Sequence, residues 1–99
     1  MPVESAVVQL LRFRIGNDIF ALPVERVVQI IERRPVTRVP GVAASIAGVF
    51  NYDGRITPAV DLAAKLRIER DDNARRTCIV IVAAKHDAED ATVGLLVDA

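Results

Sequence analysis

The clearest local structure signals of this chain lie in Gly48-Val-Phe-Asn-Tyr-Asp-Gly-Arg-Ile-Thr-Pro-Ala-Val-Asp-Leu62. Asp53-Gly54 is a dipeptide that tolerates positive φ at a two-residue turn, and extended, largely apolar runs flank it over 48–52 and 55–60. Asp61 then stands where the N-cap of a helix belongs, directly before a run of good helix formers. The stretch therefore predicts a β-hairpin that ends in one or two turns of helix, with Gly54 and Asp61 in structural roles.

The rest of the chain contains further short segments with strand character. Residues 27–31 are apolar apart from Gln29, a pattern that favours a strand buried on both faces. A single helical turn is predicted over 43–47, and polar loops over 69–76 and 85–91. The remaining strands are expected at 7–15, 19–22, 36–39, 77–83 and 92–97. Short strands at a spacing of about 8–15 residues, with only brief helical patches, predict an all-β barrel rather than β-α-β units.

The composition describes one small domain over residues 1–99. Aliphatic residues supply most of the 52% hydrophobic content, with three Phe, one Tyr and no Trp, which suits short strands around an aliphatic core. Thirteen basic and thirteen acidic residues cancel, so no global field draws in nucleic acid or an anionic membrane surface. The apolar stretches fall short of the ~20 residues of a transmembrane helix and no signal peptide is visible, so a cytoplasmic protein without membrane insertion is expected.

The chemically reactive side chains do not form a catalytic pattern. Cys78 and His86 are the only residues of their types, so neither a disulfide nor a zinc site can form within this chain, and no metal or cofactor is expected. We interpret Cys78 as a buried structural thiol and His86 as a solvated side chain. Asp53 and Asp61 stand near opposite ends of one hairpin arm, too far apart for a carboxylate pair. A small dimeric barrel enzyme of aspartic type, using Asp53, is the enzymatic alternative, but turn and N-cap are the favoured roles of these acids.

A basic cluster follows the strand predicted at 27–31. Arg33, Arg34 and Arg38 alternate with Pro and Val and are offset by Glu25 and Glu32. We interpret the cluster as a solvated rim, with contact to an acidic protein partner as the alternative.

Four ordered blocks of this sequence resemble the CheW domain family. They are Phe13-Arg-Ile-Gly-Asn-Asp-Ile-Phe-Ala-Leu-Pro-Val-Glu-Arg-Val-Val-Gln-Ile-Ile31, Val36-Thr-Arg-Val-Pro40, Gly48-Val-Phe-Asn51 and Thr57-Pro-Ala-Val-Asp-Leu62, in matching order and at matching spacing over nearly the whole chain. The resemblance implies an all-β fold of two SH3-like barrels, here with the first nearly complete and the second partial. It also implies a non-catalytic adaptor that couples methyl-accepting chemoreceptor tips to a CheA-type histidine kinase. Such an adaptor would act within a two-component system, in chemotaxis or pilus-type signalling.

The same resemblance carries a receptor-binding groove onto Val27, Gln29, Gly48, Asn51 and Asp53. The family's usual block is Asn-Leu-Arg-Gly, whereas this chain has an anion, Asp53, in place of the cation, and Gln29 stands where the family commonly has Glu. Asp53 facing a glutamate would add repulsion, whereas the Gln29 amide can donate a hydrogen bond to it. We therefore expect the two replacements to belong together and to alter receptor specificity. Gly48 is interpreted first as a backbone device, at a bulge or a close approach of another segment, and its missing side chain also leaves room for a receptor helix.

The chain is also short relative to this family. The family domain usually continues for several strands after the segment that matches Val93-Gly-Leu-Leu-Val-Asp98. A barrel that stops there would leave an unpaired edge, so we expect a homodimer through unpaired strands, with aggregation or a covering kinase domain as alternatives. A strand-exchanging interaction module without a signalling role is the third functional interpretation, beside the scaffold and the enzyme.

Overall fold

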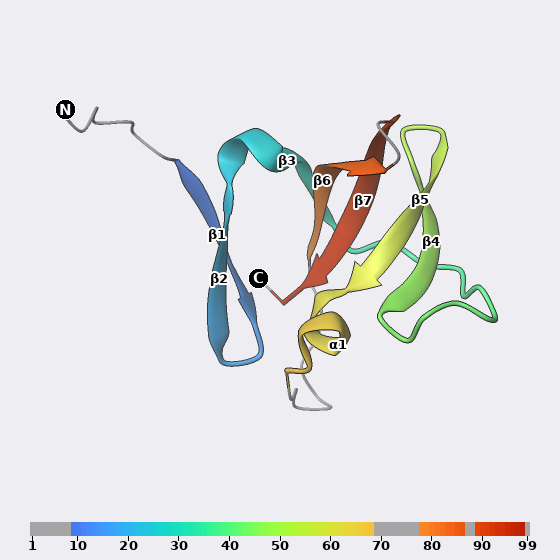
Figure 1. Ribbon diagram of the computed structural model, residues 1–99, viewed down its shortest axis with the longest axis horizontal. Coiled ribbons are helices and arrows are strands. Elements are labelled where there is room, and N and C mark those ends of the chain that lie inside the picture. Colours follow the sequence, from blue (N-terminus) through green and yellow to red (C-terminus); the bar gives the residue numbers. More distant parts are fainter. Residues whose placement is uncertain (1–8, 69–77, 87–88, 99) are drawn as a thin grey trace, which may run out of the picture.

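A computed structural model describes residues 9–68, 78–86 and 89–98 of the chain. In these ranges the structure is mainly β, with a single turn of 3-10 helix and one short α-helix (Figure 1). The elements are β1 (Leu10–Ile15), β2 (Asp18–Pro23), η1 (Val24–Arg26), β3 (Val27–Glu32), β4 (Ile46–Tyr52), β5 (Arg55–Asp61), α1 (Leu62–Leu66), β6 (Cys78–His86) and β7 (Glu89–Val97).

The strands form two sheets. β1 and β2 make an antiparallel hairpin, and the other strands make a five-stranded sheet in the order β3-β6-β7-β5-β4. β7 lies inside this sheet, antiparallel to β6 and parallel to β5, with Ala59 opposite Gly94 and Asp61 opposite Leu96. The all-β class predicted from short, regularly spaced strands is therefore confirmed, and the pairing of the described residues leaves β3 and β4 as the end strands of the sheet.

The two end strands approach each other through the segment that follows β3. Thr37 and Val49 form an isolated antiparallel bridge, in which each backbone N–H donates to the other residue's carbonyl at 2.8 Å. The predicted strand at 36–39 is thus reduced to a single bridge, because Pro35 and Pro40 bracket it and neither can donate a backbone hydrogen bond. This bridge ties β4 back to the chain that leaves β3.

The hairpin predicted from the opening stretch is present. Tyr52 pairs with Arg55, and the two turn residues Asp53 and Gly54 have φ of 52° and 79°. Two successive positive φ values match the right-handed twist of the flanking strands, which is why aspartate followed by glycine is favoured here. α1 follows β5 directly, as the sequence predicts.

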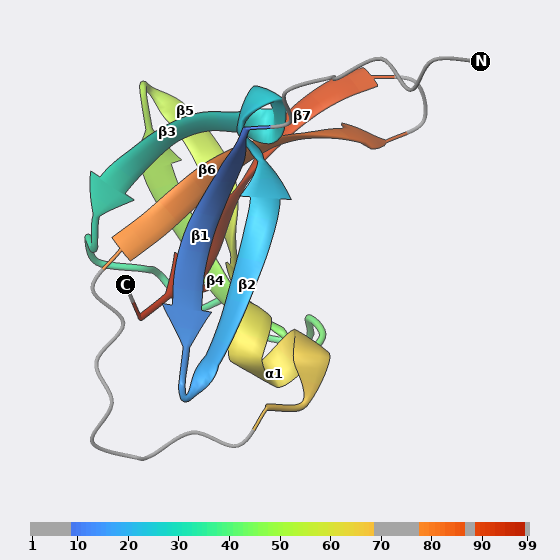
Figure 2. The same ribbon diagram turned by 90° about the vertical axis from the view of Figure 1, so that its left-hand side faces the viewer.

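β6 and β7 carry a hydrophobic core on each of their two faces. Successive side chains of a strand point to opposite faces, so Ile79 and Ile81 pack with Phe50, whereas Val80 packs with Phe13 of the β1–β2 hairpin. Figure 2 shows this hairpin lying across the second face of β6 and β7. The Asp98 N–H, directly after β7, donates to the Arg14 carbonyl of β1 at 2.9 Å and ties the hairpin to this face, while the bond of 3.0 Å from the Val24 N–H to the Gln9 carbonyl closes the open end of the hairpin itself.

Three sequence expectations about local structure are wrong. β3 is not buried on both faces, because it is an end strand, and Ile30 is 49% exposed. The helical turn predicted at 43–47 is instead a turn that leads into β4 at Ile46. The polar loop predicted at 85–91 is largely occupied by the ends of β6 and β7, which continue to pair as far as His86 and Glu89. The loop predicted at 69–76 lies outside the described residues.

The unpaired edge expected at residues 93–97 is also wrong. Leu95 pairs with Val80 on one side and with Val60 on the other, so this part of β7 has partners in both directions. The sequence did not reveal the parallel pairing with β5, which joins segments about 35 residues apart and leaves no local pattern. Among the described strands of the hairpin, β2 pairs only with β1.

Candidate protein-interaction site

The turn between β4 and β5 presents two of the predicted site residues. Asn51 and Asp53 are both exposed, and Asn51 Oδ1 accepts a hydrogen bond of 3.0 Å from the Gly54 backbone N–H. The Asn51 carbonyl accepts a second bond, of 3.1 Å, from Nη1 of Arg34. Asn51 therefore shapes the turn that carries the exposed Asp53. Arg34, which follows the other end strand β3, holds Asn51 through this second bond.

Gln29 lies beside this turn, because the tyrosine that precedes Asp53 reaches across to it. The Tyr52 hydroxyl donates a hydrogen bond of 2.7 Å to Oε1 of Gln29. The bond that we expected for Gln29 was to Asp53, but the structure gives Gln29 a different partner. Gln29 is exposed, and the bond engages only its Oε1, so its amide group still has two N–H donors to offer.

Val27 does not share a surface with Gln29. In a regular strand, residues two apart lie on one face, but the register between β3 and β6 shifts between Val27 and Gln29. Val27 pairs with Val82 and packs against the core under the β1–β2 hairpin, whereas Gln29 pairs with Ile81 and turns towards β4. The bulge therefore separates two residues that the sequence placed together.

Gly48 faces its own chain. The register between β4 and β5 shifts between Ile46 and Gly48, and Gly48 adopts a φ of 151°. A β-carbon there would lie 2.1 Å from the Thr37 carbonyl oxygen and 2.8 Å from the Val36 side chain. Both backbone interpretations of this glycine, the bulge and the close approach, match this geometry.

Asp61 stands at the opposite end of β5 from Asp53. Its Oδ1 accepts a hydrogen bond of 3.3 Å from the Ala64 N–H in the first turn of α1, as an N-cap residue does. The seven residues of β5 span about 23 Å, which keeps the two carboxylates apart. The geometry therefore gives these acids separate roles at the two ends of one strand.

Sequence reasoning did not connect Arg34 and Tyr52 with this site, because Arg34 was interpreted only as part of the basic cluster and Tyr52 was given no role. Both act across the gap between β3 and β4, and no pairing signal in the sequence connects those segments. The part of the chain that the structure describes contains no cluster of three or more His, Cys, Asp or Glu side chains suited to a metal ion. It contains no helix long and apolar enough to cross a membrane. Cys78 is half-buried, and the side chain of His86 lies outside the described residues.

Comparisons with known proteins found relatives over nearly the whole chain. The model of a family described as the CheW-like domain matches residues 9–99. A probable chemotaxis protein CheW from Rhizobium etli is 35% identical over 91 residues, which are 92% of this chain and 56% of that protein. The chemotaxis protein CheW of Thermotoga maritima is 37% identical over 90 residues, with 91% and 56% covered, and protein PilI of Pseudomonas aeruginosa is 29% identical, with 99% and 54% covered.

A solved structure supports the fold independently. The scaffolding protein TtCheW from Thermoanaerobacter tengcongensis superposes with a TM-score of 0.80 over 93% of this chain and 60% of that one, at 24% sequence identity. The chain thus spans a little over half the length of the curated relatives that it matches.

Proposed function

Because this chain belongs to the CheW-like domain family, we propose that it is a non-catalytic scaffold that couples chemoreceptor-type sensors to a CheA-type histidine kinase. The observation that carries the proposal is the family match over residues 9–99, which includes every described strand. Relatives named for chemotaxis and the relative PilI both match, so we propose a cytoplasmic signalling role in chemotaxis or a related pilus pathway.

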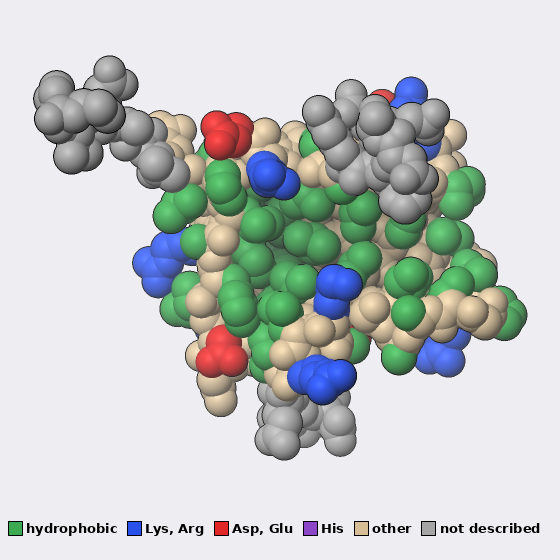
Figure 3. Space-filling view, viewed as in Figure 1, with side chains coloured by type: hydrophobic (Ala, Val, Ile, Leu, Met, Phe, Trp, Pro, Cys, Tyr) green, Lys and Arg blue, Asp and Glu red, His purple; other side chains and the backbone are tan. Residues whose placement is uncertain are grey.

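The five-stranded sheet is proposed to be the first of two SH3-like barrels. Its end strands are linked by the Thr37–Val49 bridge and by the bonds from Tyr52 to Gln29 and from Arg34 to the Asn51 carbonyl, and these contacts between β3 and β4 support the proposal of a barrel. The β1–β2 hairpin and the second face of β6 and β7 are proposed to belong to a partial second barrel. Figure 3 supports this, since hydrophobic side chains gather between the hairpin and the large sheet.

The receptor-facing surface is proposed to centre on the β4–β5 turn. Asn51, Asp53 and the Gln29 amide lie exposed at this end of the sheet, and Arg34 and Tyr52 hold them in place. Val27 and Gly48 contribute less directly, because each packs against its own chain. A rim anion such as Asp53 acts mainly on partner choice and association rate.

A homodimer stays a prediction of the sequence, but the structure points to a different strand as its interface. β7 has partners on both sides over residues 94–96, so the free edge of β2 is the candidate for pairing between two copies. Sedimentation at micromolar concentration tests whether a dimer forms.

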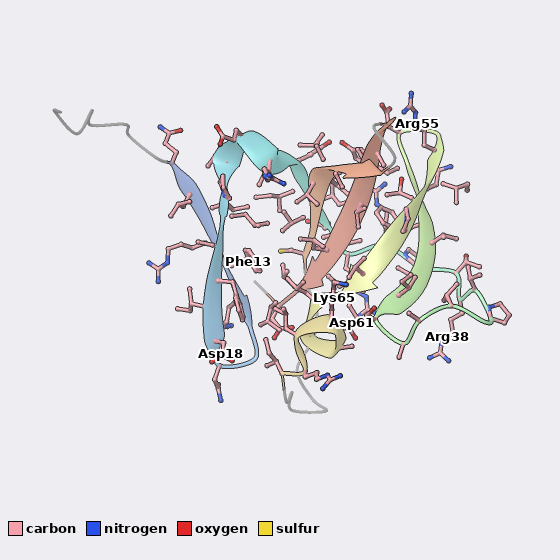
Figure 4. All side chains as sticks on the ribbon, viewed as in Figure 1. Phe13, Asp18, Arg38, Arg55, Asp61 and Lys65 are labelled. Atoms are coloured by element: carbon pink, nitrogen blue, oxygen red, sulfur yellow. The ribbon has the colours of Figure 1, made fainter. Side chains whose placement is uncertain are left out.

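Binding to two purified partners tests the proposed function. The chain is titrated separately with the regulatory domain of a CheA-type kinase and with a receptor tip fragment, both from the genome that encodes it. We expect both to bind, with Asp53→Arg changing receptor-fragment affinity by about twofold to fivefold and leaving kinase affinity unchanged. Asp53→Asn removes the charge but tolerates positive φ at the turn. Asp18→Arg is the matched control at the tip of the other hairpin, where Figure 4 places Asp18. Binding to neither partner would refute the scaffold role, and unchanged affinity in Asp53→Arg would refute this surface.

A further inference from the structure

A hollow lies at the other end of the β4–β5 hairpin from the proposed receptor surface. Its volume is about 460 Å³, and it is bounded by the segment that enters β4, by Leu96 and by Asp61 at the start of α1. This volume is within the range of sites that hold ligands. Most of its lining, at residues 38–47 and Asp61, lies at the end of the hairpin away from the Asn51–Gly54 turn, and Arg33 is the lining residue next to Arg34, which bonds the Asn51 carbonyl at 3.1 Å. A molecule seated against residues 38–44 would therefore leave the turn free.

The walls of the hollow combine apolar surface with positive charge. Val39 and Val42 are 38% and 43% exposed and stand on the segment between the Thr37 bridge and β4. Arg33 and Arg38 line the same hollow, and both are exposed. Figure 4 places Arg38 on the loop before β4. Apolar and positively charged side chains therefore lie next to each other on the wall of the hollow.

The segment that forms this wall is fixed at both ends. The Thr37–Val49 bridge holds its beginning, and the Ser45 carbonyl accepts a hydrogen bond of 2.7 Å from the Asp61 backbone N–H at its end. The Ile46 N–H donates to the Ala43 carbonyl at 2.9 Å, which closes the turn between them. A wall that is ordered before binding loses less conformational entropy when a partner docks.

The charges favour an acidic partner. Two guanidinium groups and one carboxylate, that of Asp61, line the hollow, which leaves a net positive charge. Neither Arg33 nor Arg38 makes an ion pair within the described part of the chain, whereas Asp61 accepts from the Ala64 N–H. The carboxylate in the wall and the zero net charge of the whole chain disfavour nucleic acid. Exposed guanidinium groups alone bind a small anion weakly in water, so the neighbouring valines must add apolar contact.

We propose that this hollow is a second docking site, which takes an acidic protein segment with aliphatic side chains next to its carboxylates. The carboxylates lie against Arg33 and Arg38, and an aliphatic side chain covers Val39 and Val42. The site goes beyond the coupling of receptor and kinase, because it lies away from the turn that carries Asn51 and Asp53. It gives the scaffold a surface for an additional acidic partner.

The test is an NMR titration of the 15N-labelled chain with the peptide acetyl-Glu-Leu-Glu-Glu-Leu-amide. We expect shifts confined to residues 33–47 and the start of α1, and an affinity that falls as salt rises. The double variant Arg33→Gln/Arg38→Gln should bind about tenfold more weakly, since two charge pairs are lost. Arg26→Gln, which removes an exposed arginine from η1, is the matched control and should bind as the parent does. Val42→Asn should also weaken binding, because it removes the apolar contact.

Several outcomes would overturn the proposal. Equal affinity of the double variant and the parent would do so, as would shifts that map elsewhere on the chain. Equal binding of acetyl-Gln-Leu-Gln-Gln-Leu-amide would show that charge is not recognised, and equal binding of free glutamate would show an anion site only. Binding of the kinase domain and the receptor fragment is measured with the same variants. A parent chain that binds both partners but not the peptide would refute this proposal and leave the scaffold role standing, whereas a parent chain that binds the peptide but neither partner would refute the scaffold role alone.

Discussion

Gly48 packs so closely against Thr37 that a β-carbon on Gly48 would lie 2.1 Å from the Thr37 carbonyl oxygen. That oxygen accepts the Val49 N–H in the bridge that links β4 to the segment after β3. Any side chain at position 48 must displace backbone rather than a flexible side chain. The absence of a side chain at this position is therefore needed for folding before any partner binds.

Gly48→Ala should lower the free energy of unfolding by about 3 kcal/mol, because it combines a backbone clash with an unfavourable positive φ. Urea denaturation measures this. The matched control is Gly41→Ala, where φ is 82° but nothing lies within 4 Å of an added β-carbon, so only about 1 kcal/mol is expected. Equal losses at the two positions would contradict the close approach. A substitution of Gly48 is therefore no clean test of receptor binding, since it would perturb the fold itself.

Tyr52→Phe should cost about 0.5–1 kcal/mol of stability, since it removes the donor to Gln29 at a partly exposed site. Combining Tyr52→Phe with Gln29→Ala in a double-mutant cycle should give a coupling of similar size. A parallel cycle of Gln29→Ala with Asp53→Asn should give little coupling. The reverse order of these two coupling energies would restore the pairing of Gln29 with Asp53 that the sequence suggested.

Asp61→Ala should destabilise the chain by about 1 kcal/mol, because the Ala64 N–H at the start of α1 loses its acceptor. Asp61→Asn keeps a capping oxygen and should retain most of that stability. Thermal unfolding followed by circular dichroism compares the two. Affinity for the kinase domain should be unchanged in both variants at a temperature where they remain folded. A collapse of affinity without a change in melting temperature would instead make Asp61 a partner contact.

Ile79→Ala and Ile30→Ala should differ widely in cost. Ile79 is fully buried between strands, and its truncation should cost about 3–4 kcal/mol through lost burial and a residual cavity. Ile30 is 49% exposed on an end strand, so its truncation should cost less than about 1 kcal/mol. Chemical denaturation of the two variants and the parent measures both losses in the free energy of unfolding. Similar losses would mean that β3 is buried on both faces after all.

Features encoded by neighbouring residues were predictable from the sequence. The Asp53-Gly54 turn, its flanking strands and the cap at Asp61 each depend on a few adjacent residues, and the structure contains all three. Phe13 and Ile15 stand two residues apart in the strand expected at 7–15, and both side chains lie in the same core, as the alternation of a strand requires.

Features that depend on distant partners were not predictable. The parallel pairing of β5 with β7 decides that residues 94–96 are interior, and the bulge beside β6 decides that Val27 and Gln29 face apart. The apolar run at 27–31 reads as buried because Val28 and Ile30 are hydrophobic, yet both side chains are about half exposed. For the site, the residue types were visible in the sequence, but the contacts of Tyr52 and Arg34 across the gap between β3 and β4 were not.

Co-sedimentation with receptor-containing vesicles tests the scaffold role most directly. The vesicles carry a chemoreceptor from the same genome and are pelleted with a CheA-type kinase in the presence and absence of this chain. We predict that the kinase pellets with the receptor vesicles only when the chain is added, and that the chain is found in the same pellet. Kinase in the pellet at the same level without the chain, or a chain that stays in the supernatant, would contradict the proposed coupling function.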